Sequence, residues 1–294
     1  MKSRGLDGRV VFLSASVPDI RREAEYRADP EPGVVYDRVE DAHVEVERAV
    51  VSLARAVLSA GGRLAFGAHP SISPLVAMVA GEYRLPAAAE RGPDEPPAVR
   101  SRAGSGEEAP LVLIYQSRAF QEVVPDETWL LHRLGYAQIR WTAALRGERY
   151  RPEMDGQAQC RKSLALMRQA MLRETDPVAM VALGGMSGVL EEAAMFRELF
   201  PTRRVYVMEN TGGAAARLAR HGGDAVTVLD RRVLEQLHEI DPTLQRSGRD
   251  RSGRDEPGVD QTDKVPYRYT PYPLIMQLVV EDLFRAGETE AGSV

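Results

Sequence analysis

Short runs of apolar residues recur along this chain, and segments with helical spacing separate them. Each run is continuous rather than alternating, which is typical of a strand that is covered on both faces of a parallel sheet. The predicted strands occupy residues 9–16, 63–69, 110–117, 178–185, 204–210 and 224–230.

Helical patterns fill the gaps between these runs. Between the first two strands, Val46, Val50, Leu53 and Val57 follow a helical spacing that ends at the glycine pair 61–62. Further helices are predicted at 157–174, 187–199, 212–220 and about 273–285. Alternating strands and helices form right-handed βαβ units, so we expect an α/β fold, a Rossmann-like doubly wound and mainly parallel sheet with helices on both faces.

Two stretches break this alternation. Residues 87–109 are rich in Pro, Gly and charge, and residues 245–260 contain the sequence RSGRD twice in succession. Apolar patterning resumes after each, so we interpret both as low-complexity insertions in a single domain that spans 1–294. The last residues, 287–294, are expected to form a loose tail.

Composition narrows the class of protein. The 294 residues are 44% hydrophobic, which is ample for a core, and the formal net charge of -5 argues against a broad nucleic-acid surface. Cys160 is the single cysteine, and neither CxxC nor HExxH occurs. We therefore expect a cytoplasmic protein with no metal and no cofactor, and with no membrane segment, because no apolar run of about eighteen residues is present.

Small and polar residues follow five of the predicted strands. In an open α/β sheet, ligands bind beyond the carboxyl ends of the strands, so these residues are the candidate ligand-binding set. The set consists of Ser14, Ser16, Gly67, His69, Ser117, Gly184, Gly185, Ser187, Gly188, Thr211, Gly212 and Gly213.

Two glycine-rich turns in this set, GGMSG at 184–188 and NTGG at 210–213, each precede a predicted helix. Glycines at such turns let an anion approach the free N–H groups at the start of the helix, and the helix dipole favours negative charge there. A phosphorylated ligand is the simplest occupant, although glycine at a βα turn is often only turn chemistry. Glu191 is interpreted as a first-turn acid that stabilises the helix, whereas a second carboxylate, Glu192, suggests a functional role.

Other chemistries fit less well. The sequence contains no GxSxG elbow of a serine hydrolase, and the first βα turn lacks the GxGxxG fingerprint of a dehydrogenase. Trp129 and Trp141 are expected to pack within a helical excursion rather than to stack on a base. Cys160 is interpreted as a small buried residue, and His69 is as readily a ligand contact as a satisfied histidine at the sheet edge.

Several segments together resemble the SLOG superfamily, which includes the Smf/DprA proteins and the Lonely Guy phosphoribohydrolases. They are FLSASVPD (12–19), GGRLAFGAHPSISPLV (61–76), CRKSLALMRQAM (160–171), GGMSGVLEEAAMF (184–196) and NTGGAAARL (210–218). The resemblance is to a bacterial SLOG branch related to nucleotide-sensing domains, and it implies a Rossmann-like sheet that binds nucleotides or molecules derived from them.

In Lonely Guy enzymes an arginine of an RK pair and the last glutamate of the glycine motif break an N-glycosidic bond. The resemblance places Arg161, followed by Lys162, and Glu192 in these catalytic positions. The chain departs from the enzyme pattern in three ways: one extra residue separates the glycines, Val189 replaces a threonine, and Leu183 replaces a proline.

Related domains in melastatin-type channels and antiphage systems sense ligands similar to ADP-ribose. We therefore expect binding of a nucleotide-derived small molecule such as ADP-ribose, an NAD metabolite or a nucleoside phosphate, in a bacterial defence or stress system, with a separate effector protein as a further partner. The alternative is a Lonely Guy-like N-glycosidase that releases a base by means of Arg161 and Glu192. A third hypothesis, a single-stranded DNA-binding protein, is disfavoured by the acidic charge, and the helical segment 163–171 is equally compatible with a core or with a homodimer interface.

Overall fold

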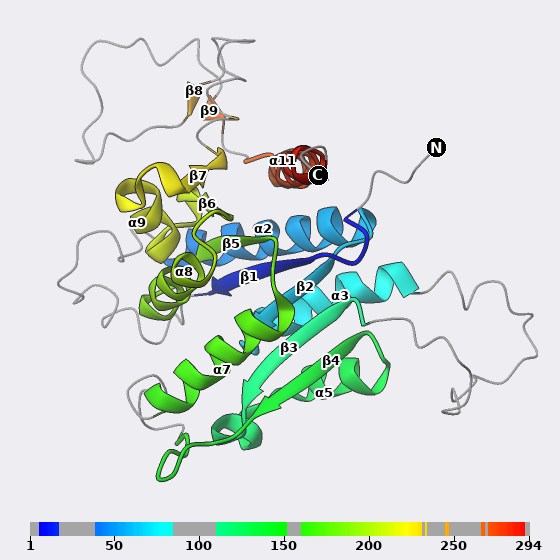
Figure 1. The fold of residues 1–294 in the computed structure, drawn as a ribbon, viewed down its shortest axis with the longest axis vertical. Helices are drawn as coiled ribbons and strands as arrows, with labels where there is room; N and C mark the ends of the chain where they lie inside the picture. The colour runs from blue at the N-terminus through cyan, green and yellow to red at the C-terminus, as the bar shows by residue number, and fades with distance from the viewer. Residues whose placement is uncertain are drawn as a thin grey trace, which may run out of the picture.

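The seven strands of the main sheet all run parallel, in the order β4-β3-β2-β1-β5-β6-β7. In the computed structural model, which describes residues 6–17, 39–84, 110–151, 160–230, 233, 245–246, 266–267 and 270–291, this sheet forms the centre of the molecule (Figure 1). Its strands are β1 (Val10–Ser16), β2 (Arg63–Gly67), β3 (Val112–Ser117), β4 (Ala137–Thr142), β5 (Ala179–Gly184), β6 (Arg204–Met208) and β7 (Val226–Val228). The predicted Rossmann-like α/β fold is confirmed, and the six predicted strands correspond to β1 to β3 and β5 to β7.

β4 differs from the sequence-based expectation, which placed Trp129 and Trp141 together in a helical excursion. Trp129 does lie on a helix, but Trp141 lies on this edge strand, whose residues pair with β3 from Val112↔Ala137 to Ser117↔Thr142. The segment alternates between inward and outward positions, because Ala137 and Ile139 are buried whereas Arg140 is exposed. Such alternation is what a strand with one solvated face requires.

The helices cover both faces of the sheet (Figure 1). One face carries α2 (Val39–Ser59), α3 (Ser73–Arg84), α5 (Asp126–Arg133) and α11 (Tyr272–Ala291), and the other carries α7 (Arg161–Thr175), α8 (Ser187–Leu199) and α9 (Gly213–His221). Short 3-10 turns, η2 (Arg118–Val123), η3 (Glu209–Thr211) and η4 (Gly223–Ala225), follow β3, β6 and α9. All the chain segments that leave the strands' carboxyl ends therefore begin at the same edge of the sheet.

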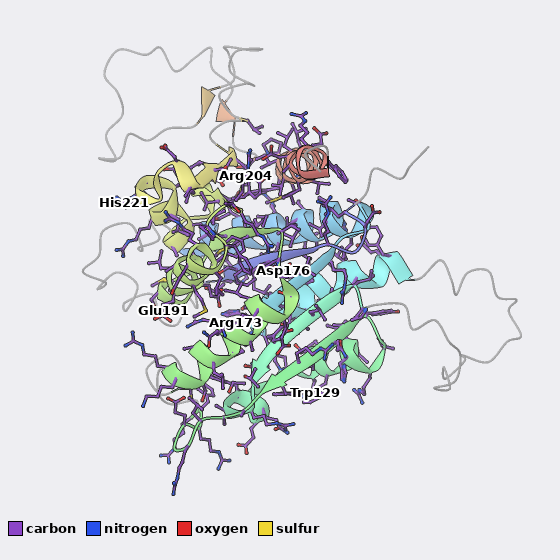
Figure 2. The ribbon with its side chains drawn as sticks, in the orientation of Figure 1. Trp129, Arg173, Asp176, Glu191, Arg204 and His221 are labelled. Atoms are coloured by element: carbon purple, nitrogen blue, oxygen red, sulfur yellow. The ribbon has the colours of Figure 1, made fainter. Side chains whose placement is uncertain are left out.

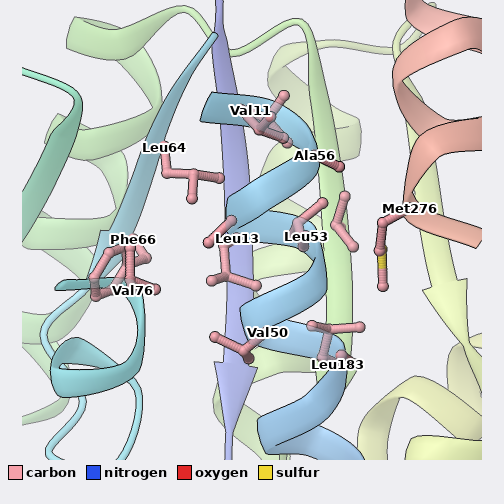
Figure 3. Close-up of a cluster of buried hydrophobic side chains, with 14 of the residues drawn as sticks. Val11, Leu13, Val50, Leu53, Ala56, Leu64, Phe66, Val76, Leu183 and Met276 are labelled. Atoms are coloured by element: carbon pink, nitrogen blue, oxygen red, sulfur yellow. The ribbon is translucent and has the colours of Figure 1, made fainter. Parts of the chain in front are cut away.

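The larger core lies between the sheet and α2. Figure 3 shows Val50 and Leu53 of α2 above Leu13 of β1, with Val76 of α3 on one side and Met276 of α11 on the other. These side chains are at most 1% exposed. Burial of a side chain of this size contributes about 1.5–3 kcal/mol, so this helix is held by its apolar stripe rather than by its intrinsic propensity.

A second core lies on the opposite face and fixes the helices that carry the candidate site. Phe12 of β1, Met171 of α7 and Phe196 of α8 are fully buried there, and the rings of Phe12 and Phe196 lie 6.3 Å apart. In this core α7 packs on β2 to β4 and α8 packs on β1 and β5, and the two helices contact each other, so their polar side chains are held next to each other.

Most of the predicted insertions, 87–109 and 247–260, lie outside the described residues. Within the second insertion and after it, Gln245–Arg246 pairs in parallel with Pro266–Tyr267 as β8 and β9. The C-terminal helix was expected to end at about residue 285, but α11 continues to Ala291 and so extends into the predicted tail. Among the helices of the described ranges, none is both long and apolar enough to cross a bilayer.

Candidate functional site

The order of the strands reverses between β1 and β5, with β2 to β4 on one side and β6 and β7 on the other. Chains that leave neighbouring strands at such a switch point diverge to opposite faces, and ligands of open α/β sheets bind there. Ser16 at the end of β1 pairs with Gly184 at the end of β5. The N–H of Gly185 donates to the carbonyl oxygen of Ser16 at 3.1 Å, so the GGMSG turn lies at the switch point.

The GGMSG turn (residues 184–188) needs glycine at its second position. Gly185 has φ of 81°, in the left-handed region that side chains disfavour. A Cβ at this position would also lie 2.2 Å from Val189 Cγ2 and 3.4 Å from Ser16 Oγ. The backbone of the turn is therefore pressed against the first turn of α8 and against the end of β1.

The NTGG turn (residues 210–213) lies directly against the GGMSG turn. The N–H of Gly184 donates to Thr211 Oγ1 at 2.8 Å, and this hydroxyl donates to the carbonyl oxygen of Met208 at 2.6 Å. A second link runs from the N–H of Ala214 to the carbonyl oxygen of Gly185, at 2.8 Å. The two predicted glycine-rich turns form one structure, and the Thr211 hydroxyl supports it from within.

The amides of Ser187 and Gly188 at the start of α8 are the candidate donors for a ligand. The first N–H groups of a helix have no acceptor within the helix, and the N-cap residue, Met186, makes no side-chain cap. Ser187 is exposed, whereas Gly188 is buried. With the helix dipole, these amides favour an acceptor of negative charge at the beginning of α8.

Five residues further along, Glu192 forms a hydrogen-bonded cluster with residues from β1 and α7. Ser14 Oγ donates to Glu192 Oε2 at 2.5 Å, and Arg168 Nε donates to Glu192 Oε1 at 3.1 Å. Arg168 also reaches Glu191 Oε2 through NH1, at 2.5 Å. We call Ser14, Arg168, Glu191 and Glu192 the Arg168 cluster; Figure 2 shows Glu191 where α8 faces α7.

The charged groups of the Arg168 cluster are shielded from water to different degrees. The side chain of Arg168 is 4% exposed and that of Glu192 12%, whereas Glu191 is 40% exposed. One guanidinium thus faces two carboxylates, and the hydroxyl of Ser14 supplies a further donor to Glu192. A largely buried carboxylate that accepts hydrogen bonds from an arginine and a hydroxyl is held in a fixed orientation.

The end of β2 completes the surroundings of Glu192. A Cβ on Gly67 would lie 3.3 Å from Met167 Cε and 4.0 Å from Glu192 Oε1. The absence of a side chain at this position therefore lets the β2 backbone approach the carboxylate. Ser14 is itself only 1% exposed, so its hydroxyl serves Glu192 rather than pointing to solvent.

The structure brings Arg168, not Arg161, to Glu192. Arg161 is the exposed first residue of α7, seven residues before Arg168. Seven residues are about two helical turns, so Arg161 lies on the same face of α7 and about 10.5 Å further along the axis. At that end of the helix, the carboxylate of Glu148 accepts the N–H groups of Lys162 at 3.1 Å and Ser163 at 2.7 Å. The side chain of Ser163, followed by these two amides, lowers the pKa of Glu148.

The spacing of residues along α7 places Arg168 on the buried face of the helix. The buried face of α7 comprises Ser163, Met167, Arg168, Met171, Leu172 and Thr175. An arginine within such a face has to have a partner, because an unpaired buried charge is costly. Sequence reasoning selected the RK pair instead and did not consider this position.

His69 lies two residues beyond Gly67 and is only partly exposed. Burial lowers the pKa of its imidazole to about 4, so the ring is neutral near pH 7. The N–H of Ser71 approaches Nδ1 at 3.3 Å, which leaves the ring proton on Nε2. His69 therefore has one neutral N–H donor, at Nε2.

The other predicted residue outside this centre is Ser117. Its Oγ accepts the N–H of Ala119 at 3.2 Å and caps η2, and the residue is fully buried. β3 is two strands from β1, a separation of about 10 Å. Ser117 is thus held in the fold near the same sheet edge but apart from the Arg168 cluster.

The remaining candidates have packing contacts. The rings of Trp129 and Trp141 stack at 5.7 Å, and Figure 2 shows Trp129 on α5, away from Glu191. Cys160 is fully buried, and burial raises the pKa of its thiol. Over the described ranges, no three His, Cys, Asp or Glu side chains gather in a way that suits a metal ion.

Part of the chain matches a known protein family. Residues 100–237 match the model described as the SLOG cluster3 family. This match supports membership of the SLOG superfamily. The SLOG match includes α7, both glycine-rich turns, and the residues Arg168, Glu191 and Glu192, whereas Ser14 and Gly67 precede it. Membership suggests a function related to nucleotides and leaves the ligand and the role open.

Other comparisons add little to the SLOG assignment. A solved structure, the X-ray structure of TM1055, a Northeast Structural Genomics Consortium target, is 14% identical, with a TM-score of 0.39. The alignment covers 78% of this chain and 99% of that one. A comparison with curated proteins found no match.

Proposed function

We propose that this protein binds a nucleotide-derived ligand, such as ADP-ribose, an NAD metabolite or a nucleoside phosphate, at the switch point between β1 and β5. The observation that carries the proposal is the contact between two glycine-rich turns beside the largely buried carboxylate of Glu192. The phosphate would accept the amides at the start of α8. The ribose hydroxyls would donate to the carboxylates of the Arg168 cluster.

The distance along α8 between the first amides and Glu192 fits a phosphate and a ribose that are joined to each other. Five residues separate Ser187 from Glu192, which corresponds to a rise of about 7.5 Å along the helix. This is comparable with the length of a ribose 5′-phosphate. Arg168 neutralises one of the two carboxylates, so that an anion bound at the start of the helix is not strongly repelled.

The role that we propose is sensing, in a bacterial defence or stress system with a separate effector protein. This role rests on the analogy with other SLOG domains. A sensor needs its ligand to stay intact, and the departures of the GGMSG turn from the enzyme pattern agree with that requirement. The chemistry of the Arg168 cluster nevertheless supports one alternative, hydrolysis of an N-glycosidic bond.

In that alternative, the C1′–N bond breaks with its electron pair going to the base, and positive charge develops at C1′. The carboxylate of Glu192 stabilises this charge, the oxygen of a water molecule bonds to C1′, and the water proton goes to the base. Arg168 is the arginine in contact with Glu192. Arg161, which the family pattern suggested, would contact a more distant part of the ligand.

Calorimetric titration with ADP-ribose, AMP, NAD and inorganic phosphate tests binding, and chromatography of the same mixtures detects released base. We expect saturable binding of at least one nucleotide, about tenfold weaker in Glu192→Gln, because a buried acceptor for the ribose is altered. Glu191→Gln is the matched control, since Glu191 contacts the same arginine but is more exposed, and it should weaken binding less.

Two results would decide against the proposal in different ways. No heat and no thermal stabilisation with any of these compounds would reject nucleotide binding. Free base that appears with the wild type, disappears in Glu192→Gln and persists in Glu191→Gln would reject a pure sensor and establish the hydrolase.

A further inference from the structure

The NTGG turn is held from behind by residues that lie far along the chain. The carboxylate of Asp230 is fully buried, and its two oxygens accept the N–H groups of Glu209 at 3.1 Å and Asn210 at 2.8 Å. A buried carboxylate bonded to two consecutive amides fixes the backbone of η3 strongly, because each of these hydrogen bonds is assisted by charge.

The same support continues into the GGMSG turn. η3 ends at Thr211, whose hydroxyl accepts the N–H of Gly184. Asp230 is therefore connected to the first glycine of the ligand turn through η3 and one side chain. A displacement of η3 by even 1 Å would break the bond to Gly184, because hydrogen bonds of this kind need a donor–acceptor distance near 3 Å.

A second support comes from the C-terminal helix. Asn210 Nδ2 donates to Thr270 Oγ1 at 2.6 Å, and α11 begins two residues later at Tyr272. The hydroxyl of Tyr272 donates to Glu45 on α2 at 2.6 Å. The start of α11 is thus bound both to the NTGG turn and to the helix that covers β1.

We propose that Asp230 and Thr270 are positioning residues, which hold the two glycine-rich turns in their ligand-binding geometry and couple that geometry to the docking of the first turn of α11. The proposal rests on the proposed function, since it takes the turns to be the ligand site. By linkage, whatever strengthens the docking of the first turn of α11 tightens ligand binding, and the ligand in turn stabilises that docking. The beginning of α11 is a place where a partner would regulate the site.

α11 also provides a control for this coupling. Asp282 anchors the same helix to β6, where it accepts hydrogen bonds from Tyr206 at 2.7 Å and Arg204 NH1 at 2.6 Å. Arg204 begins β6 and so lies at the sheet edge opposite the turns. Loss of the Asp282 anchor weakens α11 without acting directly on η3.

The test uses Thr270→Val, which keeps the shape of the side chain but removes the acceptor, with Thr270→Ser as the conservative rescue and Asp282→Asn as the control. Hydrogen exchange is followed at the amides of Gly184 and Ala214, with Met180 within β5 as an internal reference. AMP binding is measured on the same full-length proteins.

Relative to Met180, we expect Thr270→Val to speed exchange at Gly184 and Ala214 about tenfold and to weaken AMP binding about tenfold, with Thr270→Ser close to wild type. Asp282→Asn should leave the ratio to Met180 unchanged. Unaltered ratios in Thr270→Val, or equal effects of Asp282→Asn, overturn the coupling. If wild type binds no nucleotide but the ratios change as expected, the support of the turns stands and the proposed ligand class is rejected.

Discussion

At the scale of single residues, the charge balance of the candidate site depends on Arg168. It is almost fully buried, and it is the cation that contacts both Glu191 and Glu192. Its removal leaves one buried and one half-buried carboxylate without their counter-charge. Loss of one partner of a buried ion pair is more costly than the pair's net contribution would suggest, because the remaining charge stays desolvated.

We therefore expect Arg168→Met to lower the free energy of unfolding by about 3 kcal/mol in urea denaturation at pH 7. Arg161→Met, seven residues earlier on an exposed position of the same helix, should change it by no more than about 0.5 kcal/mol. The double variant Arg168→Met with Glu192→Gln should recover part of the loss. Equal effects of the two arginine variants would contradict the assignment.

The lowered pKa of His69 predicts that the free energy of unfolding depends on pH. Its pKa is lowered to about 4 in the folded protein, compared with about 6.5 when unfolded, because burial disfavours the charged ring. Between these values the unfolded chain binds a proton that the folded protein does not. Stability due to a neutral His69 is thus present above pH 6.5 and is lost as the pH falls towards 4.

The expected loss is on the order of 1–2 kcal/mol, less than full burial would give, because the ring is partly exposed. Urea denaturation at pH 7, 6 and 5 measures this loss in the free energy of unfolding. The substitution His69→Gln should remove the part of the pH dependence that is due to this residue. A ring whose NMR signals titrate near pH 6.5 in the folded protein would show this account to be wrong.

Much of the candidate site follows from local chemistry, but its arginine does not. Glycines at a βα turn and a glutamate on the next helix predict a donor set and a carboxylate side by side. Arg161 and Arg168 lie seven residues apart and therefore share one face of α7, so periodicity does not tell which of them faces Glu192. The packing of α7 on β2 to β4 decides which of the two arginines lies beside Glu192, and no local sequence pattern contains this information.

At the scale of elements, the turn between β5 and α8 should tolerate no side chain at its second glycine. Gly185→Ala combines an unfavourable φ with a Cβ that meets Val189 Cγ2 at 2.2 Å. We expect a loss of about 3 kcal/mol in the free energy of unfolding.

Gly147→Ala separates these two effects. Gly147 has a similar φ of 85°, but no atom lies within 4 Å of a Cβ built there. Its substitution should cost about 1 kcal/mol, from backbone strain alone. Similar losses for the two variants would mean that the close approach of α8 to the turn is not rigid.

The elements that sequence analysis found are those with continuous apolar runs. β1 and β5 are buried on both faces, and such runs stand out against the surrounding polar residues. β4 forms an edge of the sheet and needs only alternate buried positions, a pattern that a short helical segment with one apolar face also produces. The distinction depends on whether a neighbouring strand is there to pair with it, and that is a property of the folded chain.

At the scale of the whole molecule, a substitution in α11 tests whether this helix and the sheet unfold as one cooperative unit. Met276 of α11 is fully buried against α2, and the two tryptophans, Trp129 and Trp141, lie at the β4 end of the sheet. Met276→Ala should cost about 2–4 kcal/mol. In one cooperative unit, tryptophan fluorescence and circular dichroism shift by the same denaturant concentration.

Separate transitions for the two signals, or a fluorescence midpoint unaffected by Met276→Ala, would divide the molecule into independent parts. The outcome also bears on the coupling of α11 to the turns, because a helix that unfolds by itself at low cost is a natural point of regulation.

The Arg168 cluster joins residues from segments that are distant in the chain, and this arrangement has an evolutionary consequence. The amides that would hold an anion belong to the backbone and survive most codon changes, whereas the guanidinium that faces Glu192 is encoded by one codon in α7. A single codon change that removes this guanidinium would leave the amides in place but would take the counter-charge away from both carboxylates. We therefore expect that a related sequence without this arginine also lacks one of the two glutamates.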